Sequence, residues 1–382
     1  MGLRVSRKQA EMSTSYDCIV IGGGIVGAAT ARALAGRGRR VLVLDRAMPG
    51  GEASGASAGM LTPQVEVQAD DPILPLAIAA RERYAELVPE LDRRTGVNVG
   101  WAGGGSVQVA FDAEEAAQLE AQVGAQRALG LKAEWLGRAE LARRHPGIGP
   151  AVLGALFAPD DARVNNVTLT AALLADAVRS GAEVADHEEV TEIVVDSARV
   201  TAVKTARGRY ATANAVVAAG AWSPALRGLP RALPIEPVRG QIAVVTWPRG
   251  EPAGVLFGRH TYIVPRGEEA ILGSTMEKAG FAKDTTAGGM ATIFTGTIAM
   301  LPSLAEQRIL RTWAGLRPLT PDGCPMIGPD PDVAGLWYAT GHGRKGVLLG
   351  PLTGEIVRDL MLDGKTAWDI SPCSVTRFDK RT

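Results

Sequence analysis

The sequence lacks the marks of several large protein classes. No apolar run approaches the ~18 residues of a membrane-spanning helix. The 41 acidic and 41 basic residues cancel, so the net charge does not indicate nucleic acid or an anionic membrane surface as a partner. Three cysteines, Cys18, Cys324 and Cys373, form no CxxC pair and no metal-ligand spacing. We therefore expect a reduced, cytoplasmic protein that has no membrane span and binds no metal.

The N-terminal stretch also lacks a targeting signal. Residues 1–15 (MGLRVSRKQAEMSTS) are polar and contain no apolar core of the kind that a signal peptide needs. The start MGLRVS fits the loose myristoylation pattern, but no polybasic patch accompanies it. A disordered overhang over residues 1–15 is the better interpretation.

The length and composition are those of a two-domain globular protein. The chain has 382 residues, which is too long for one ordinary domain and comfortable for two. Apolar residues make up 46% and charged residues 21%, so there is enough apolar material for sizeable cores.

A dinucleotide-binding unit occupies the front of the chain. An apolar run enters the turn GGGIVG at residues 22–27, a helical pattern of small and aliphatic residues follows, and a second apolar run ends in Asp45. Gly22 permits the tight turn, Gly24 lets the backbone approach a pyrophosphate, and Gly27 lets the helix pack close to the strand. Asp45, eighteen residues after Gly27, is placed to bind a ribose hydroxyl, although an ordinary solvated acid is the alternative.

The apolar runs on either side of this turn, Cys18 to Ile21 and Val41 to Leu44, predict two buried strands with a helix between them. The N-terminus of that helix would supply amide donors to the phosphates. This unit alone does not choose between FAD and NAD.

Residues 181–220 favour FAD. Short alternating runs such as EIVVD and VTAVKTA, separated by turn residues, predict a small antiparallel meander. Ala215 to Ala219 then form a buried apolar strand that ends in Gly220. A second nucleotide-contacting strand after a meander is typical of two-segment FAD folds and is lacking in simple NAD dehydrogenases. Before the meander, Leu169 to Ser180 predicts an amphipathic helix.

A late glycine-rich loop, GHGRKG at residues 341–346, has the composition of an anion-binding segment. Three glycines frame a histidine, an arginine and a lysine. A phosphate-binding P-loop would continue with Lys and then Ser or Thr after its last glycine, whereas Val347 and Leu348 follow here. The anion is therefore not the phosphate of a P-loop nucleotide.

Five motifs together resemble the glycine oxidase branch of the D-amino-acid oxidase family of flavoproteins. They are ASGASAGMLTPQVE, HTYIVPR, LGSTM, TWAGLRPLTPDG and GHGRKGVLLGP, and they occur in the family's order. The resemblance extends from about Tyr16 to Phe378 and so covers nearly the whole chain.

The resemblance implies an α/β fold in which a Rossmann-like, discontinuous FAD-binding domain is joined to an α+β substrate domain with an antiparallel sheet. The FAD domain would comprise residues 16–90, 155–225 and 325–382, and the substrate domain residues 91–154 and 226–324. Residues 112–144 read as helices, and the runs QIAVVTW, HTYIVP and AILGS read as strands.

The resemblance also implies a substrate site. Its members would be Arg317, Arg344, Tyr262, His260, Met276, Met60 and Gly343. Arginine suits a substrate carboxylate because its planar fork forms two parallel hydrogen bonds. Arg317 stands between the apolar Leu316 and Pro318, an unusual place for a solvated charge, with a structural ion pair as the alternative. Arg344, whose alternative is a phosphate or solvent contact, would make the GHGRKG loop the second carboxylate anchor.

The other substrate-site members carry open alternatives. Tyr262 would donate from its phenol to the carboxylate. His260 would share a strand face with Tyr262 or be structural. Met60 and Met276 would shape the pocket or merely fill the core. Glu66 matches a residue near the family's cavity entrance and can equally be a surface acid.

For the cofactor, the resemblance implies non-covalent FAD. Besides the glycines of the first turn, the matching positions are Ile25, Val26, Asp45, Arg46, Ala53, Ser54, Ala58, Gly59, Met60, Val190, Ala219, Gly220, His342, Gly343, Arg344, Lys345, Gly346, Val347 and Leu348. No side chain in this set is an evident general base, which fits direct hydride transfer from Cα to flavin N5 rather than proton abstraction. Redox chemistry of this kind belongs to the cofactor.

Two positions depart from the family pattern. Glycine oxidases often carry phenylalanine where Gly343 stands and asparagine where Lys345 stands. The loss of a bulky ring beside Arg344 would enlarge or reshape the pocket. We therefore expect that the enzyme accepts an amine larger than glycine, such as an N-substituted glycine or a small D-amino acid.

The expected activity is oxidation of glycine or an N-alkylglycine to a 2-oxo acid, with O2 reduced to hydrogen peroxide. In this family the product feeds the thiazole of thiamine, and many members are homotetramers. One alternative keeps the fold but passes electrons to a carrier other than oxygen. A sarcosine-oxidase-like enzyme with covalent flavin is disfavoured because Cys324 does not match the covalent motif. A non-catalytic protein that retains FAD is disfavoured by Arg317, Arg344 and Tyr262 occurring together.

Overall fold

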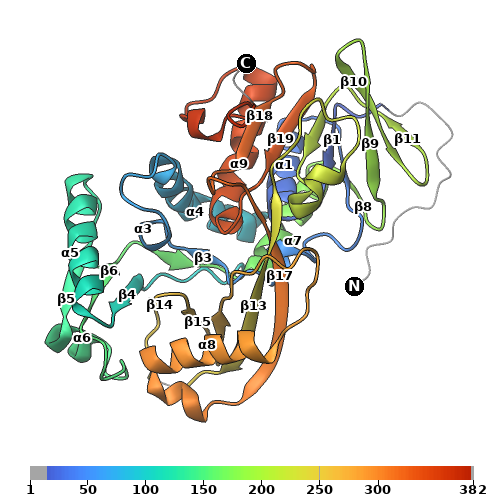
Figure 1. Cartoon of the computed structure of the whole chain (residues 1–382). Helices are drawn as coiled ribbons and strands as arrows, with labels where there is room; N and C mark the ends of the chain where they lie inside the picture. Colours follow the sequence, from blue (N-terminus) through green and yellow to red (C-terminus); the bar gives the residue numbers. More distant parts are fainter. Residues whose placement is uncertain (1–14, 249, 380–382) are drawn as a thin grey trace.

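The computed structural model describes residues 15–248 and 250–379. Apart from Ser15, the expected overhang over residues 1–15 lies outside the described residues. Within these ranges the chain forms a six-stranded and an eight-stranded sheet, each with its own helices (Figure 1). Among the described helices, none combines the length and the apolarity needed to cross a membrane.

The six-stranded sheet has the order β18-β19-β12-β1-β2-β8. Its strands are β1 (Cys18–Ile21), β2 (Val41–Leu44), β8 (Glu183–Ala185), β12 (Ala215–Val217), β18 (Met326–Pro329) and β19 (Leu336–Thr340). β18 runs antiparallel to β19, whereas the other neighbours pair in parallel. The predicted strands β1 and β2 are confirmed, and β12 is two residues shorter than the predicted run.

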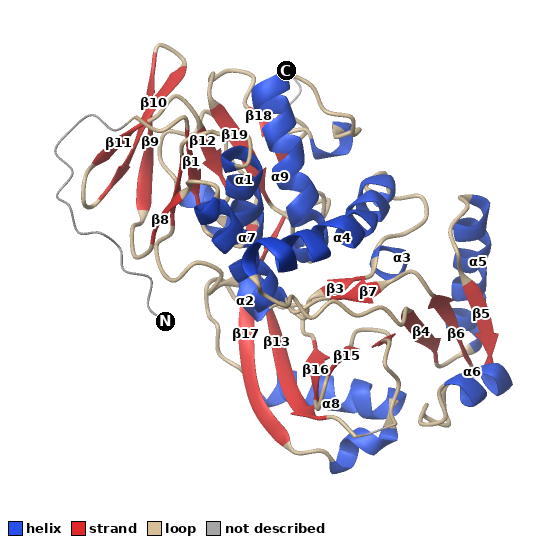
Figure 2. Ribbon diagram, turned by 180° about the vertical axis from the view of Figure 1, so that it is seen from behind, coloured by secondary structure: helices blue, strands red, loops and turns tan. Residues whose placement is uncertain are grey.

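The two faces of this sheet are covered by different structures (Figure 2). Cys18 and Val20 of β1 pack against helices α1 (Ile25–Ala35), α4 (Leu74–Thr95), α7 (Asn166–Arg179) and α9 (Gly346–Asp363). Ile19 and Ile21 point the other way and pack against the meander β9 (Val190–Asp196), β10 (Arg199–Thr205) and β11 (Arg209–Ala211). Every residue of β1 is therefore buried, because its side chains point alternately to the two faces of the sheet and each face is covered by another layer.

The meander and the helix before it are confirmed as elements. The three strands form an antiparallel sheet of order β11-β10-β9. The helix α7 begins at Asn166, earlier than the predicted Leu169, because the Asn165 side chain caps it by accepting from the amides of Val167 and Thr168.

The eight-stranded sheet has the order β17-β13-β16-β15-β14-β4-β6-β5. Its strands are β4 (Ser106–Ala110), β5 (Glu134–Gly137), β6 (Gly154–Ala158), β13 (Glu236–Thr246), β14 (Val255–Phe257), β15 (Tyr262–Arg266), β16 (Glu269–Gly273) and β17 (Ile309–Leu319). The neighbours pair antiparallel except for β14 and β4, which pair in parallel. Helix α8 (Ala287–Met300) packs on one face and α5 (Ala113–Ala128) on the other.

The remaining elements are short. They are α2 (Ala53–Ala56), β3 (Met60–Leu61), α3 (Pro63–Glu66), α6 (Arg138–Arg144), β7 (Ala162–Arg163), η1 (Gly220–Ala225), η2 (Pro302–Glu306) and η3 (Ser371–Cys373). Strands β3 and β7 pair with each other. The predicted helical stretch 112–144 contains α5 and α6, but β5 separates them.

The chain crosses between the two sheets several times, which makes both halves discontinuous in sequence. β1 and β2 belong to the first sheet, β4 to β6 to the second, β8 and β12 to the first, and β13 to β17 to the second. The expected boundary between residues 154 and 155 falls inside β6. Because β6 pairs with both β4 and β5, the chain leaves the eight-stranded sheet only after Ala158.

Candidate active site

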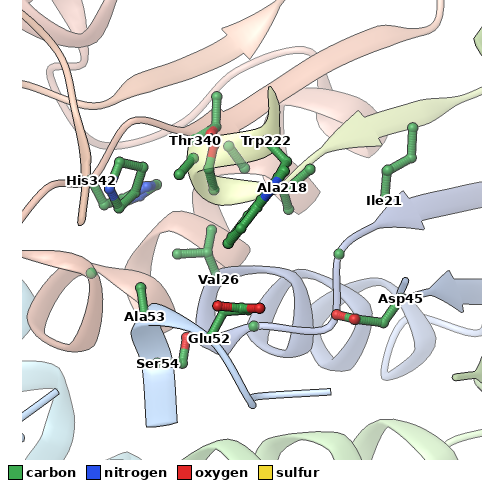
Figure 3. A pocket seen from close by; sticks show the side chains of 18 of the residues that line it. Ile21, Val26, Asp45, Glu52, Ala53, Ser54, Ala218, Trp222, Thr340 and His342 are labelled. Carbon is green, nitrogen blue, oxygen red and sulfur yellow. Dashed lines mark hydrogen bonds between the residues drawn. The ribbon is translucent and has the colours of Figure 1, made fainter. Parts of the chain in front are cut away.

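A cavity of about 400 Å³ lies at the carboxyl ends of β1, β2 and β12 (Figure 3). Ile21, Asp45 and Ala218, which end or follow these three strands, contribute to its wall. Parallel strands point their carboxyl ends toward one edge of the sheet, and this edge is where α/β proteins commonly bind ligands. We call this space the larger cavity.

The glycine turn between β1 and α1 has no room for side chains. Gly22 has a φ of 107°, and a Cβ on it would lie 2.5 Å from the carbonyl oxygen of Ala218. A Cβ on Gly27 would lie 1.9 Å from the carbonyl oxygen of Gly22. Both contacts are far below van der Waals distance. The close packing that the sequence predicts for Gly27 is therefore present, although Gly27 itself does not line the cavity.

The N-terminus of α1 opens into the larger cavity. Its N-cap, Gly24, offers no side-chain cap, and the first turn of the helix contains no acidic residue. The amide of Ile25 donates to the Ser54 hydroxyl at 2.8 Å. The partial positive charge of a helix N-terminus makes this edge suitable for an anion.

Asp45 and Arg46 follow β2 along one wall of this cavity. The Asp45 carboxylate accepts from the amide of Gly23 at 2.7 Å and from that of Ala47 at 2.9 Å. The Arg46 guanidinium lies 3.5 Å from the ring centroid of Trp222 and forms an ion pair of 2.9 Å with Glu52. The two residues that follow β2, Asp45 and Arg46, therefore place a hydrogen-bond acceptor and a cation next to the cavity.

The GHGRKG loop closes the other end of the larger cavity. His342 is buried, and burial lowers the pKa of its imidazole to about 3, with the nearby Lys345 as a smaller cause. Its Nε2 lies 3.0 Å from the Thr353 hydroxyl in α9. Gly343 has a φ of 55°, and its amide donates to the carbonyl of Pro318 at 2.9 Å. The hydrogen bonds of His342 and Gly343 thus hold the backbone of the GHGRKG loop at the wall of the larger cavity.

A second, smaller pocket of about 60 Å³ adjoins the larger cavity. It is lined by Ala53, Ala56, Ser57, Ala58, Met60, Glu66, Gly240, Ile242, Tyr262, Gly315, Arg317, Gly343 and Arg344. Four of these, Ala53, Ser57, Gly343 and Arg344, also line the larger cavity. The two spaces therefore meet at the α2 segment and the GHGRKG loop.

Arg317 reaches this pocket from β17. Its guanidinium donates to the carbonyl of Thr275 at 3.1 Å and to the hydroxyl of Ser274 at 2.6 Å. Burial lowers the pKa of Arg317, while the phenol of Tyr262 acts in the opposite direction. Within residues 15–248 and 250–379, no carboxylate lies in ion-pair contact with it. A largely desolvated guanidinium without an acidic partner among the described residues is costly, so this part of the pocket is suited to an anion.

Tyr262 is the first residue of β15 and is buried on the same side of the sheet as Met60. Its phenol fills the space opposite Gly273, where a Cβ would lie 2.5 Å from the hydroxyl oxygen. Burial raises the pKa of the phenol, and the positive charge of Arg317 partly offsets that effect. The hydroxyl therefore stays protonated and able to donate near neutral pH.

Arg344 and Glu66 form an ion pair of 2.8 Å at the rim of the smaller pocket. The Glu66 side chain is only 6% exposed, whereas that of Arg344 is 45% exposed. Glu66 also accepts from the Thr62 hydroxyl at 3.1 Å. The surface-acid alternative for Glu66 is therefore wrong, because its carboxylate lies inside the pocket.

Most sequence-predicted residues line one of the two spaces. In the larger cavity are Gly22, Gly24, Ile25, Val26, Asp45, Arg46, Ala53, Ser54, Val190, Ala219, Gly220, His342, Gly343, Arg344, Gly346 and Val347. In the smaller pocket are Ala53, Ala58, Met60, Tyr262, Arg317, Gly343 and Arg344.

Two predicted substrate residues lie elsewhere. His260 is exposed and sits in a bend before β15, so the strand alternation that would align it with Tyr262 does not reach it. Met276 is 50% exposed and follows β16 rather than turning into the pocket. The structure therefore does not bring either side chain to the site.

Besides Gly27, three predicted cofactor positions fall outside the lining. Gly59 is packed against the residue that follows β7, because a Cβ on Gly59 would lie 2.0 Å from the carbonyl oxygen of Val164. Lys345 turns away and donates to the carbonyl of Gly323 at 3.0 Å. Leu348 is buried in the core between α9 and its neighbouring helices.

Sequence reasoning missed several lining residues. The main ones are Glu52, Ser57, Glu189, Trp222 and Ile242. Glu52 and Ser57 flank positions already singled out, and Trp222 stands two residues after Gly220, so proximity to a contact segment was the available signal. No local pattern marks Ile242, because its position depends on the pairing of β13 with β16 and β17.

No cluster of three or more His, Cys, Asp or Glu residues suited to a metal ion occurs in the described part of the chain.

Comparisons with known proteins agree with this geometry. Residues 17–360 match the family model described as FAD dependent oxidoreductase (DAO). The glycine oxidase of Geobacillus kaustophilus is 34% identical over 96% of this chain and 98% of its own length, and its crystal structure superimposes with a TM-score of 0.92 over 96% of this chain and 99% of that one.

Two further similar proteins carry names other than glycine oxidase. The bifunctional protein ThiO/ThiG of Trichormus variabilis is 35% identical over 96% of this chain, which spans only 55% of that protein. The iminodiacetate oxidase of Chelativorans sp. BNC1 is 27% identical, with a TM-score of 0.84 over 94% of this chain and 98% of that one. Taken with the glycine oxidase match, the chain therefore belongs to the D-amino-acid-oxidase (DAO) family of FAD-dependent oxidoreductases and is an amino-acid oxidoreductase of the glycine oxidase type.

Proposed function

We propose that this enzyme oxidises glycine or N-substituted glycines, with FAD in the larger cavity and the substrate carboxylate on Arg317 in the smaller pocket. The observation that carries the proposal is the partly buried Arg317 guanidinium, which has no carboxylate partner among the described residues, in a pocket that adjoins the larger cavity. A carboxylate ligand would supply the missing charge and two parallel hydrogen bonds.

The residues of the larger cavity fit FAD. Its volume of about 400 Å³ falls within the ~300–1,000 Å³ of ordinary small-molecule sites. The glycine turn presents bare backbone, and the start of α1, which has no acidic residue in its first turn, would present a positive dipole end to a pyrophosphate. The cavity is also long, because its lining includes both Asp45 beyond β2 and His342 in the C-terminal loop.

Individual roles follow from position along this cavity. We assign Asp45 to the ribose, the α1 N-terminus with Ile25 and Val26 to the pyrophosphate, and Val190 to the adenine. The segment from Ala53 to Ser54 and the loop from His342 to Val347 would flank the isoalloxazine, since both border the smaller pocket as well as the cavity or lie next to residues that do.

The chain's own contribution to the reaction is positioning and charge. Arg317 and Arg344 would hold the substrate carboxylate, and Tyr262 would donate to it from a phenol that burial keeps protonated. FAD, when bound, accepts two electrons from the substrate, in our proposal as a hydride from Cα. His342 is neutral near neutral pH and binds Thr353, so we assign it no proton transfer. Orientation of this kind can account for up to ~7–11 kcal/mol of a reaction barrier.

The size of the smaller pocket favours a small amine. A water molecule needs roughly 10–15 Å³ of such space, so about 60 Å³ accommodates only a handful of non-hydrogen atoms, as in glycine. A larger N-substituent would have to extend past Gly343 toward the larger cavity. A side chain at Gly343 would instead point at Leu319, 3.0 Å from a Cβ there, and Leu319 lines neither space. The glycine therefore does not by itself enlarge the pocket.

For glycine and O2, the balanced reaction is glycine, O2 and water giving glyoxylate, ammonia and hydrogen peroxide. The choice of acceptor is tested by supplying substrate to the enzyme in air and measuring oxygen uptake and peroxide. Oxidation that needs an added quinone or dye, with no oxygen uptake, would contradict the proposed acceptor.

The substrate proposal is tested by mixing the yellow holoenzyme anaerobically with single amines and recording the loss of flavin absorbance. The panel is glycine, sarcosine, bulkier N-alkylglycines, D-alanine and D-proline. We expect glycine or an N-alkylglycine to reduce the flavin fastest. Faster reduction by D-proline or D-alanine than by every glycine derivative would overturn the assignment.

A further inference from the structure

A loop from the eight-stranded half reaches the wall of the larger cavity. Residues 278–285, which we call the clasp, connect β16 with α8. The base of the clasp is fixed by the buried Gln241 of β13, whose side-chain amide donates to Glu277 at 2.9 Å and accepts from the amide of Thr286 at 2.7 Å. Between these two anchored ends, residues 280–285 are all exposed.

The clasp contacts two residues that line the larger cavity. The Phe281 ring lies 5.3 Å from the ring of Trp222, centroid to centroid. The Lys283 ammonium lies 3.1 Å and 3.2 Å from the two carboxylate oxygens of Glu52. Trp222 and Glu52 both border the larger cavity, on elements that follow β12 and β2, and Figure 3 shows both among its side chains.

These two wall residues belong to one connected group. Arg46 stacks on Trp222 at 3.5 Å and pairs with Glu52 at 2.9 Å, so the three side chains link the segments that follow β2 and β12. The clasp contacts two members of this group, Trp222 through Phe281 and Glu52 through Lys283. An apolar contact at Trp222 and an ionic contact at Glu52 therefore restrain the same stretch of wall from two points.

The charges in this wall explain why Lys283 matters. Glu52 places a carboxylate in the wall of a cavity suited to a pyrophosphate, and the two negative charges would repel each other. Two cations offset that charge: Arg46, which lines the cavity, and Lys283, which does not. Without Lys283, the Glu52 carboxylate would be neutralised by Arg46 alone.

We propose that the clasp retains FAD, because Phe281 and Lys283 hold Trp222 and Glu52 in the closed wall and must be displaced before the dinucleotide can leave. This inference rests on the assignment of FAD to the larger cavity. It makes two exposed residues of the substrate-side half part of the cofactor site, although neither side chain lines the cavity.

The test measures release of FAD from the holoenzyme. The protein is diluted in buffer, and the rise in fluorescence of the freed flavin gives the rate. F281A should speed release roughly twofold to tenfold, as expected for loss of an aromatic pair. K283A should speed release by about twofold to fivefold, as expected for an exposed ion pair, and the effect should shrink at 1 M salt.

Lys278 provides a matched control within the same loop. It is also an exposed lysine in an ion pair, but with Glu236, and neither residue lines the cavity. K278A should release FAD at the wild-type rate. Equal acceleration by K278A and K283A would show that any loss of charge loosens the loop and would overturn the proposed contact.

A double-mutant cycle isolates the ion pair. In an E52Q background Lys283 has no carboxylate to bind, so adding K283A should not change the release rate further. A full K283A effect in that background would overturn the Glu52 contact. Thermal unfolding of the apoprotein separates a general loss of stability from a change in cofactor release.

A cavity-lining variant distinguishes the two levels of the proposal. D45N removes the negative charge and one of the two acceptor oxygens of the side chain that we assign to the ribose, and should also speed release. If D45N accelerates release while F281A and K283A match the wild type, the clasp is wrong and the cavity assignment stands. If D45N leaves release unchanged, the cavity assignment fails and the clasp proposal falls with it.

Discussion

The six-stranded and eight-stranded halves hold their functional residues in different ways. The larger cavity depends mainly on backbone: a turn without side chains, the start of α1 and the left-handed Gly343. The smaller pocket depends on side chains, above all Arg317 and Tyr262, which project from separate strands of the eight-stranded sheet. A dinucleotide site of this kind is specified by where glycine occurs, whereas a carboxylate site is specified by which charged group is buried.

The two halves also differ in how far apart their parts lie in the sequence. The turn, helix and acid of the larger cavity fall within residues 18–45. Glu66 and Arg344, which are paired in the smaller pocket, are 278 positions apart. The larger cavity can therefore form its turn, helix and acid from one short segment. The smaller pocket forms only when segments that are far apart in the sequence fold next to each other. The predictions below test this contrast, in order of expected size.

The largest effect is expected at Arg317. Arg317→Met removes the carboxylate anchor and should lower kcat/KM for glycine by about 10²–10³-fold, since truncating one partner of a buried charge pair costs about 2–5 kcal/mol. FAD content should not change, because Arg317 does not line the larger cavity. Arg317→Lys keeps the charge but loses the planar fork, so its kcat/KM for glycine should lie between those of the wild type and Arg317→Met.

Arg311 on the same strand offers the control for that experiment. It is half exposed and paired with Glu269 at 2.6 Å, outside both spaces. Arg311→Met should leave kcat/KM within about twofold of the wild type. A comparable loss in both variants would mean that β17 tolerates no substitution, and the anchoring role of Arg317 would lose its support.

The backbone side of the contrast is tested at Gly27. Gly27→Ala would drive a Cβ to 1.9 Å from the Gly22 carbonyl oxygen and separate α1 from β1. We expect the free energy of unfolding to drop by about 1–3 kcal/mol and FAD to bind more weakly. Chemical denaturation and flavin content measure both.

Gly124 is the matched glycine for this comparison. It lies inside α5, and a Cβ there would have no neighbour within 4 Å. Gly124→Ala should leave stability unchanged or raise it by up to ~1 kcal/mol through helix propensity. Equal destabilisation at both positions would contradict the close-packing argument for Gly27.

His342 is expected to make the free energy of unfolding depend on pH in the acid range. Its pKa is about 3 in the folded protein and 6.5 for a free histidine, so the unfolded state binds the extra proton between these values. Stability should therefore fall as the pH drops from about 6 to 4, with a contribution of roughly 1.4 kcal/mol per pH unit from this group. The variant His342→Asn should lose that contribution. Parallel pH profiles for the variant and the wild type would refute it.

The smallest effect is expected at Glu66. In the ligand-free enzyme Glu66 occupies Arg344, so a substrate carboxylate must compete with it. Glu66→Gln should tighten the binding of acetate, a carboxylate without an amine, by about twofold to fivefold. Titration of the flavin absorbance with acetate measures this. Weaker acetate binding in the variant would show that Glu66 does not compete for Arg344.

The same contrast explains how much the sequence predicts. The turn from Gly22 to Gly27 and Asp45 is local, because steric exclusion of side chains and hydrophobic periodicity leave few other structures for those residues. Strands β1 and β2 are therefore predicted to the residue.

The smaller pocket is not local, and resemblance to a family was needed to find it. Arg317 and Tyr262 are predicted correctly as pocket-lining residues because whole motifs match. His260 is misplaced because β15, whose alternation would align it with Tyr262, begins only at Tyr262. The contact between Trp222 and Phe281 leaves no trace in the sequence, since it depends on how a loop from one half meets the other.

The central claim is that Arg317 recognises the substrate carboxylate. Its most direct test is anaerobic flavin reduction by glycine and by methylamine, which lacks the carboxylate, in the wild type and in Arg317→Met. Glycine should reduce the wild-type flavin far faster than methylamine, and this preference should largely disappear in the variant. A variant that reacts slowly yet keeps the full preference for glycine would contradict the account.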